Sequence, residues 1–237
     1  AFRLSIHGIH GAHDFKIFKD NVKVGDNVVD LGANVGYFTL ILAKLVGPTG
    51  KVFAFEPDPR NLTLLKKNIE YNNYKNVIIV PKAVSNVNDK CTLYVGQKTF
   101  GQNKIYKPEK TRTQKFIPTD SETIRLDDFF KANNLLNKIS FIKMDIEGAE
   151  VLALSGMKKI LKLNKNIKIF TEVEISYLED AGSSYDQFID LLTENNFALS
   201  LADNRSETLI KVNRAQLEKI LNDESSVNIF CVRELNS

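Results

Sequence analysis

The seven residues Asp30-Leu31-Gly32-Ala33-Asn34-Val35-Gly36 decide the fold class of this chain. The apolar pair Val28-Val29 before them predicts a buried strand, and residues 37–46 (YFTLILAKLV) after them predict a helix. Gly32 and Gly36 tolerate backbone angles that other residues resist, and because they carry no Cβ they let the backbone approach a ligand closely. The sequence therefore predicts a strand, a glycine turn and a helix of the kind that binds a nucleotide-type cofactor.

The spacing of this turn and its acids select between cofactors. A dinucleotide site needs G-x-G-x-x-G to rest a pyrophosphate on the helix, whereas here Asn34 stands in the middle glycine's place and Asp30 precedes the turn. A carboxylate repels an anion and attracts a cation, which favours the amino and sulfonium groups of S-adenosylmethionine. Glu56 follows Gly36 by 20 residues, the interval expected for an acid that accepts hydrogen bonds from ribose hydroxyls.

The composition is typical of one domain. With 237 residues, of which 43% are hydrophobic and 26% charged, the chain can bury a sizeable core without being divided, so we expect a single domain over residues 1–237. No apolar run approaches the roughly 20 residues of a membrane-spanning helix. Cys91 and Cys231 lack metal-ligand spacing and indicate a reducing compartment, which predicts a cytoplasmic protein. Because the chain begins at Ala1, an upstream segment could have been removed.

Strand and helix patterns alternate along the chain. We expect strands near 27–31, 51–56, 76–84, 139–145, 167–174, 197–202 and 227–234, and helices at 36–46, 61–73, 149–161, 184–195 and 214–222. This order predicts an α/β fold with a doubly wound, mostly parallel seven-stranded sheet, whose last two strands form an antiparallel pair at one edge. Ligands bind such a sheet beyond the carboxyl ends of its strands, where the sequence places Asp30, Glu56, Val84, Asp145 and Glu172. Asp58, followed by Pro59, is expected to cap the helix at 61–73.

Residues 142–150 (IKMDIEGAE) form a second strong motif. Together with residues 30–39, Phe55-Glu56-Pro57 and Ala83-Val84-Ser85, this motif resembles the FkbM-type methyltransferase family over roughly residues 24–174. The resemblance implies a class I, Rossmann-like methyltransferase fold and S-adenosylmethionine-dependent O-methylation of a small molecule or sugar. It also implies a set of site residues: Asp30, Gly32, Asn34 and Gly36 at the methionine-side loop, Glu56 at the ribose, Ala83 and Val84 at the adenine, and Asp145 facing the methionine moiety and the substrate.

Asp145 and Glu147 are the candidate catalytic residues. A sulfonium methyl group is already activated, so aligning a nucleophilic oxygen behind it in a dry pocket can supply about 7–11 kcal/mol. A carboxylate that takes the hydroxyl proton adds typically 10²–10⁴-fold. We expect Asp145 in the site. For Glu147 two explanations are equally good: a catalytic role, or the general preference for acids at the start of a helix. Lys143 either pairs with an acid in the pocket or extends to water.

Two groups of residues could bind a metal, although we predict no metal site. Carboxylates could supply oxygen ligands at Asp145, Glu147, Glu172 and Glu174. His7, His10 and His13 are spaced by three, but Gly8 and Gly11 argue against a helix that presents all three on one face. We interpret residues 1–20 as a lead-in or lid, with a histidine base over the cofactor as the alternative.

Residues 85–124 are too long for an ordinary connection, and we expect this insertion to lie over the substrate site. Segments 92–95 and 115–117 are predicted to pair as a ribbon. Basic residues dominate 98–115, where Lys98, Lys104, Lys107, Lys110, Arg112 and Lys115 face the single acid Glu109. This charge favours an acidic acceptor such as a nucleotide sugar, unless the segment is only a solvated loop.

Three classes of function remain open. The first is an S-adenosylmethionine-dependent O-methyltransferase that acts on a hydroxyl of a small molecule or sugar. The second is an RNA or protein methyltransferase, and the third is a dinucleotide-binding oxidoreductase or a non-catalytic nucleotide-binding module. Residues 145–148 (DIEG) lack the proline and aromatic residues of enzymes that methylate base amines, and a net charge of +3 is weak evidence for nucleic acid, so we do not expect a nucleic-acid acceptor. No pattern predicts the oligomeric state.

Overall fold

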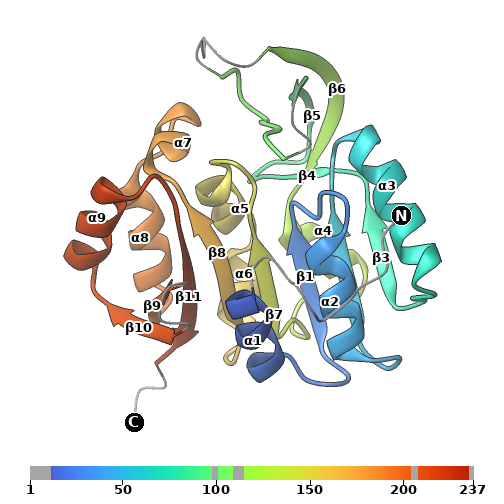
Figure 1. Cartoon of the computed structure of the whole chain (residues 1–237), viewed down its shortest axis with the longest axis horizontal. Coiled ribbons are helices and arrows are strands. Elements are labelled where there is room, and N and C mark those ends of the chain that lie inside the picture. The colour runs from blue at the N-terminus through green and yellow to red at the C-terminus, as the bar shows by residue number, and fades with distance from the viewer. Residues whose placement is uncertain (1–11, 98–100, 109–114, 204–207, 235–237) are drawn as a thin grey trace.

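A large sheet forms the centre of the molecule. The computed structural model describes residues 12–97, 101–108, 115–203 and 208–234. Its eight strands lie in the order β10-β9-β11-β8-β7-β1-β2-β3 (Figure 1). Their bounds are β1 (Asn27–Leu31), β2 (Lys51–Phe55), β3 (Val77–Val80), β7 (Phe141–Met144), β8 (Lys168–Val173), β9 (Phe197–Asp203), β10 (Thr208–Val212) and β11 (Val227–Arg233). Strands β3, β2, β1, β7 and β8 are parallel, whereas β11 runs antiparallel to both β8 and β9.

Helices cover both faces of this sheet. One face packs against α1 (Ala12–Asn21), α2 (Tyr37–Val46) and α3 (Pro59–Tyr71), and the other against α4 (Leu126–Ala132), α5 (Glu150–Gly156), α6 (Lys158–Leu163), α8 (Tyr185–Thr193) and α9 (Arg214–Asp223). The short helix α7 (Ile175–Asp180) follows β8. The predicted α/β, doubly wound, mostly parallel class of fold is therefore confirmed.

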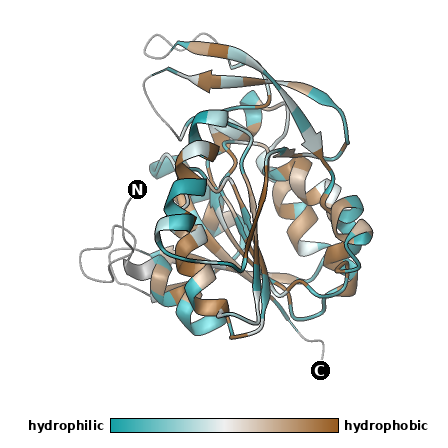
Figure 2. Ribbon diagram, turned by 90° about the vertical axis from the view of Figure 1, so that its right-hand side faces the viewer, coloured by the Kyte–Doolittle hydropathy of each residue, from teal (hydrophilic) through white to brown (hydrophobic). Residues whose placement is uncertain are grey.

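Burial on both faces explains the continuous apolar runs of the central strands. Side chains alternate along a strand, so Val28 packs with the α2 side while Val29 and Leu31 pack with the α4 side. Strand β2 repeats this division through Val52 and Phe53. Hydrophobic residues accordingly mark the central strands and the flanking helices in Figure 2.

A small second sheet rises from the carboxyl edge of the large one (Figure 1). It contains β4 (Ala83–Val84), β5 (Lys90–Gly96) and β6 (Phe116–Ile124) in the order β4-β6-β5. Strands β5 and β6 pair antiparallel, with Lys90 opposite Glu122 and Gly96 opposite Phe116. The ribbon predicted within the insertion is confirmed and is longer than expected.

Four details of the sequence prediction are wrong. The sheet has eight strands rather than seven, because the mostly exposed β10 has no buried face to reveal it. The predicted antiparallel pairing of the last two strands is confirmed for β9 and β11, but β10 adds a third strand beyond β9, and β11 lies inside the sheet. The strand predicted at 76–84 is divided into β3 and β4 by Pro81, which cannot donate to a ladder. The helix predicted at 149–161 is divided into α5 and α6 at Met157.

The lead-in predicted at residues 1–20 joins the core from residue 12 onward. Phe18 on α1 is fully buried, and its ring meets the rings of Phe141 and Phe170 edge-on at 5.3 Å and 5.0 Å between centroids. Residues 1–11 lie outside the described part of the chain. No helix in the described ranges combines the length and the apolar character needed to cross a membrane.

Candidate active site

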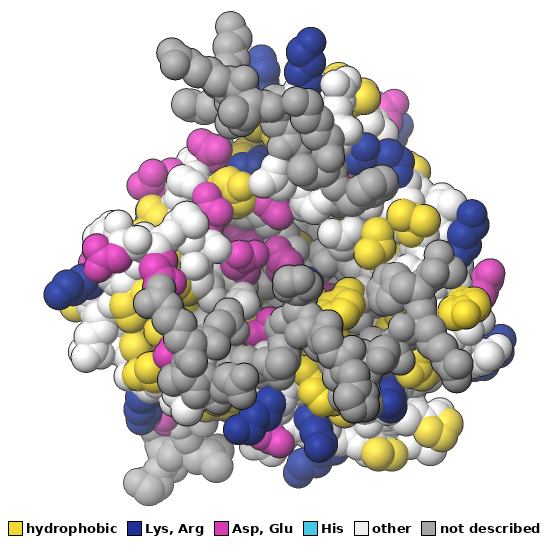
Figure 3. Space-filling view, viewed as in Figure 1, with side chains coloured by type: hydrophobic (Ala, Val, Ile, Leu, Met, Phe, Trp, Pro, Cys, Tyr) yellow, Lys and Arg dark blue, Asp and Glu magenta, His cyan; other side chains and the backbone are white. Residues whose placement is uncertain are grey.

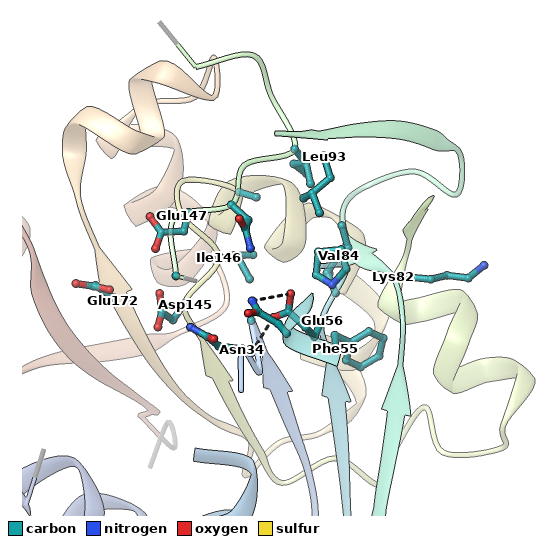
Figure 4. Close-up of a pocket in the computed structure, with 18 residues that line it drawn as sticks. Asn34, Phe55, Glu56, Lys82, Val84, Leu93, Asp145, Ile146, Glu147 and Glu172 are labelled. Carbon is teal, nitrogen blue, oxygen red and sulfur yellow. Dashed lines mark hydrogen bonds between the residues drawn. The ribbon is translucent and has the colours of Figure 1, made fainter. Parts of the chain in front are cut away.

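A cavity lies beyond the carboxyl ends of β1, β2 and β7, beneath the insertion. It holds about 730 Å³ of empty space, counting its open mouth. Its lining changes from apolar through polar to acidic along its length (Figure 4): Phe55, Val84 and Leu93 lie at one end, Asn34 and Glu56 in the middle, and Asp145, Glu147 and Glu172 at the other end. Pro57, Asn61 and Ala83 also line the cavity. Seven of the residues predicted to form the site therefore meet here: Gly32, Asn34, Glu56, Ala83, Val84, Asp145 and Glu147.

Glu56 is held by three donors in the middle of the cavity. One carboxyl oxygen accepts from the backbone N–H of Asn34 at 2.7 Å, and the other accepts from the backbone N–H of Asp58 at 2.9 Å and from Asn61 Nδ2 at 3.3 Å. Asn34 has a φ of +50°, which turns its N–H toward this carboxyl group. Burial raises the pKa of Glu56 to about 7 although these hydrogen bonds oppose the rise.

The glycines of the turn allow parts of the protein to approach one another. A Cβ on Gly32 would lie 1.9 Å from the carbonyl oxygen of Asp145, so only glycine lets this turn lie against the end of β7. Gly36 has a φ of +97°, and a Cβ there would lie 2.6 Å from Leu65 Cδ1 on α3. Gly32 lines the cavity, whereas Gly36 does not. The sequence predicted that Gly36 lets the backbone approach a ligand. In the structure Gly36 instead lets the start of α2 approach α3.

Asp30 lies beneath the cavity rather than in its wall. Its side chain is fully buried, and Thr39 Oγ1 donates a hydrogen bond to it at 2.6 Å. Its other oxygen lies 3.4 Å from Lys143 Nζ. Asp30 therefore does not line the cavity, and its carboxylate pairs with a buried lysine; that its charge faces the cofactor stays a prediction.

Lys143 joins β1, the glycine turn and β7. Its ammonium group lies 3.5 Å from Asp145 Oδ2 and donates to the carbonyl oxygen of Gly32 at 3.0 Å. Burial opposes the charge of Lys143, but the carboxylates of Asp145 and Asp30 outweigh it, so its pKa lies above the ordinary value. The prediction that Lys143 pairs with an acid is confirmed by its contact with Asp145. Its further contacts with Asp30 and with the Gly32 carbonyl oxygen stabilise the glycine turn.

The acidic end of the cavity contains one carboxyl oxygen that is buried without a partner. Glu147 Oε2 has no hydrogen-bond donor among the described residues. Burial, followed by the nearby charges of Asp145 and Glu172, raises the pKa of Glu147 to about 8. Glu150, beside it on α5, instead accepts a hydrogen bond from the backbone N–H of Ile146 at 3.2 Å. An unpartnered carboxyl group with a pKa near neutrality is a candidate for proton exchange, whereas Glu150 supports the local backbone.

Of the two possible metal sites, only the one formed by carboxylates lies wholly within the described residues. In the parts of the chain that the structure describes, no three His, Cys, Asp or Glu side chains are arranged to hold a metal ion. Glu174 does not line the main cavity but a small adjoining one, which it shares with Asp145, Glu147, Glu150, Glu172 and Tyr177. His7 and His10 lie outside the described residues, and His13 lies in the first turn of α1.

Residues 101–108 of the insertion, which we call the strap, cross the cavity and are fastened on both sides. Gly101, Asn103 and Ile105 line the cavity. On the Glu56 side, Asn103 Nδ2 donates to Asp58 Oδ2 at 3.0 Å. On the acidic side, the Tyr106 hydroxyl donates to the carbonyl oxygen of Glu147 at 2.6 Å. The strap therefore lies over the cavity, and that this cavity takes the substrate stays a prediction.

Of the three described basic residues in this segment, Lys104 is buried, whereas Lys107 and Lys115 are exposed. Lys104 is only 5% exposed, and its ammonium group lies 3.6 Å from Asp180 Oδ2 and 3.5 Å from the centre of the Tyr177 ring. Lys107 is exposed and does not line the cavity. Lys98, Lys110 and Arg112 fall outside the described residues. The charge of Lys104 is therefore not available to an acidic acceptor.

Sequence reasoning missed several residues of this site. Asn61 faces Glu56 from the first turn of α3. The N-cap predicted at Asp58 is confirmed, since its side chain accepts from the Arg60 N–H at 2.8 Å. Asn103 and Ile105 reach the cavity from a segment without any recognisable pattern. Asn61 could have been found from its position five residues after Glu56, in the first turn of the predicted helix, which brings it back to the end of the strand.

Comparison with known proteins agrees with this geometry. The sequence profile of the methyltransferase FkbM domain matches residues 30–199 of the chain. "Methyltransferase 1" of Beauveria bassiana (strain ARSEF 2860) is 26% identical over 144 residues, a match that covers 55% of this chain and 57% of that protein. The match thus spans little more than half the length of this curated relative.

Solved structures share the fold. An rRNA methylase from Streptococcus thermophilus superposes with a TM-score of 0.54 at 14% identity, over 99% of this chain and 100% of that one. Fibrillarin from Aeropyrum pernix, solved with natively bound S-adenosyl-L-methionine, superposes with a TM-score of 0.51 at 12% identity, over 97% of this chain and 84% of that one. The profile match covers well over half of the chain. The chain therefore belongs to the FkbM methyltransferase family, whose methyl donor is S-adenosylmethionine.

Proposed function

We propose that the protein transfers the methyl group of S-adenosylmethionine to a hydroxyl of a small molecule or sugar whose reacting end carries no negative charge. The observation that carries this proposal is the Glu147 carboxyl group, which lies at the acidic end of the cavity with one buried, unpartnered oxygen and a pKa of about 8. A base with a pKa near the working pH is suited to removing the proton of a hydroxyl.

The three zones of the cavity fit the three parts of the cofactor. The apolar walls of Val84 and Leu93 suit the adenine ring, and Glu56 suits the ribose because its carboxyl group is already fixed by Asn34 and Asp58. Asp145 suits the positively charged methionine end. S-adenosylmethionine supplies a methyl group bound to a sulfonium sulfur. When the methyl group is transferred, this sulfur keeps the electron pair of the broken bond and becomes a neutral thioether.

The chain's own residues then account for the remaining steps. An acceptor held between Ile105 and Glu147 would place its oxygen at the acidic end, and Glu147 would take the proton as the oxygen gains the methyl group. Asp145 forms an ion pair with Lys143 at this end, at 3.5 Å. The strap limits the access of water, which strengthens these electrostatic interactions.

The charges around the cavity argue against an anionic acceptor. Figure 3 shows acidic side chains gathered beside α7, where the adjoining cavity brings together Asp145, Glu147, Glu150, Glu172 and Glu174. The nearby cations Lys104 and Lys143 are buried in ion pairs, and Lys82 pairs with Glu122 at 2.5 Å. A phosphate or an RNA backbone would meet repulsion at this end, which favours a neutral or amine-bearing acceptor.

A two-stage experiment tests the proposal. Calorimetric titration with S-adenosylhomocysteine and with NAD should show binding of the first and none of the second. Methyl transfer from radiolabelled S-adenosylmethionine is then compared across neutral sugars, amino sugars, phosphorylated sugars and single-stranded RNA. The proposal expects labelled methyl ethers from the first two groups; label on RNA, or on nitrogen alone, would contradict it.

Glu147→Gln gives the matched test of mechanism. It should lower turnover of the preferred acceptor by about 10²–10⁴-fold with little change in cofactor affinity. Glu179→Gln, which alters an exposed glutamate on α7, should leave turnover unchanged. Equal turnover in both variants would remove Glu147 from the chemistry.

A further inference from the structure

The turn that carries Glu147 has an unusual backbone. Glu147 has a φ of +56° and Gly148 a φ of +100°, so two consecutive residues lie in the left-handed region. A residue with a Cβ is disfavoured there and persists only where its surroundings hold it. Contacts outside the turn must therefore fix the direction of the Glu147 side chain.

Tyr106 of the strap supplies one such contact. Its hydroxyl donates to the carbonyl oxygen of Glu147 at 2.6 Å and lies 3.3 Å from the carbonyl oxygen of Tyr177. A Cβ on Gly148 would lie 2.8 Å from this hydroxyl and 2.2 Å from the Tyr177 oxygen, so the turn, the strap and α7 meet without spare room. Burial, followed by the charge of Asp180, holds the pKa of the Tyr106 hydroxyl above its ordinary value, so it remains a donor.

Lys104 supplies the second contact, from two residues earlier in the strap. Its buried ammonium group is held between Asp180 and the ring of Tyr177, and it also lies 5.2 Å from the centre of the Tyr106 ring. A cation so placed fixes the strap to α7 and brings positive charge to the acidic end of the cavity. Among the charged groups that act on Glu147, Asp145, Glu172 and Glu150 disfavour its ionised form, whereas Lys104 favours it.

We infer that Tyr106 and Lys104 are positioning residues, brought to the active site by the insertion, which hold Glu147 in its left-handed conformation with its carboxyl group directed into the cavity. The inference rests on the proposed function, because it is the role of Glu147 as a base that gives this positioning its purpose. It assigns the otherwise unpatterned strap a part in catalysis rather than in attracting an acidic acceptor.

The test follows the ionisation of Glu147 directly in the full chain. Protein labelled with ¹³C at the glutamate carboxyl carbons is titrated by NMR without cofactor or acceptor, and Glu147→Gln identifies the signal. Lys104→Met removes a favourable cation and should raise the titration midpoint by about half a pH unit or more. Tyr106→Phe should release the turn, let the carboxyl group reach water, and lower the midpoint by a similar amount.

Matched controls separate positioning from general damage. Tyr94→Phe removes a hydroxyl that makes no hydrogen bond within the described residues, and Lys107→Met removes an exposed charge from the strap; both should leave the midpoint unchanged. Lys104→Arg keeps the charge and should restore the parent midpoint. Thermal melting by circular dichroism confirms that each variant is folded at the titration temperature.

The outcomes are distinct. Midpoints that stay at the parent value in folded Lys104→Met and Tyr106→Phe would overturn the inference, as would equal shifts in the control variants. Once an acceptor is known, Tyr106→Phe should lower kcat with little change in the KM of the acceptor. The shifts expected in the titration, combined with no methyl transfer to any hydroxyl, would instead refute the proposed function while leaving the positioning intact.

Discussion

Replacing Glu56 by Gln tests the cofactor half of the site most sharply. The buried carboxyl group already accepts hydrogen bonds from Asn34, Asp58 and Asn61, so its oxygens are fixed before a ribose arrives. Hydrogen bonds to a charged partner contribute about 1.5–3 kcal/mol, so Glu56→Gln should weaken S-adenosylhomocysteine binding roughly 10- to 150-fold. The amide nitrogen would also face one of the backbone donors, which should lower the free energy of unfolding by about 1–3 kcal/mol.

The pH dependence of affinity provides a second measure of the same residue. Because the pKa of Glu56 is raised to about 7, the carboxyl group that we propose as the ribose acceptor is mostly protonated at pH 6. The affinity of the parent protein should therefore fall by up to about tenfold per pH unit below that pKa, and Glu56→Gln should lose this dependence. Calorimetry between pH 5.5 and about 8, well below the melting temperature, measures both effects.

The exposed Glu70 on α3 provides the control, since Glu70→Gln changes charge without touching the cavity. Either of two results would refute the reasoning about Glu56. One is an unchanged dissociation constant in a folded Glu56→Gln protein, and the other is a pH dependence in this variant that matches the parent.

Three further predictions concern turnover, the glycine turn and stability. Asp145→Asn should lower turnover at least about 10²-fold in a methyl-transfer assay while the protein stays folded, and full activity would exclude Asp145 from the reaction. Gly32→Ala should sharply lower the melting temperature, because the new Cβ would lie 1.9 Å from a carbonyl oxygen. The control Gly182→Ala, at a φ of +74° with open space around it, should lower the free energy of unfolding by only about 1–2 kcal/mol. Similar losses of stability in the two variants would contradict the packing argument. Folding raises the pKa of Glu147 from 4.5 to about 8 and that of Glu150 from 4.5 to about 7, so the folded protein binds more protons than the unfolded chain between these values. The free energy of unfolding in urea should therefore fall as pH rises through this window, by at most about 1.4 kcal/mol per pH unit for each group. A rise in this free energy would show that other groups dominate.

Local patterns explain why much of the fold could be predicted. Strand β1, its glycine turn and α2 follow from a few adjacent residues, and the N-cap at Asp58 follows from the Asp-Pro pair. The alternation of strands and helices was sufficient for the doubly wound class, because each element has its own apolar pattern. Strand β10 was missed since four of its five residues are exposed, which removes the pattern that identifies a strand.

Contacts between distant segments explain what could not be predicted. The position of Asp30 below the cavity depends on Lys143, 113 residues later in the chain, and no local feature of either residue shows that they meet. Counting charges in the insertion could not distinguish Lys104, which is buried against α7, from the exposed Lys107. The strap as a whole reaches the active site through contacts with Asp58 and Glu147, which only the three-dimensional structure reveals.

The internal position of β11 has a consequence for how the chain assembles. This strand lies between β8 and β9, and residues 227–233 pair with segments that precede them in the chain on both sides. Until these residues are available, β8 is an unpaired edge and the β9–β10 hairpin has no place to attach. Such non-local pairings form slowly and leave exposed strand edges prone to aggregation in the meantime. A fragment that ends before residue 227 should therefore aggregate rather than yield a smaller folded domain, even though it contains every residue that lines the cavity.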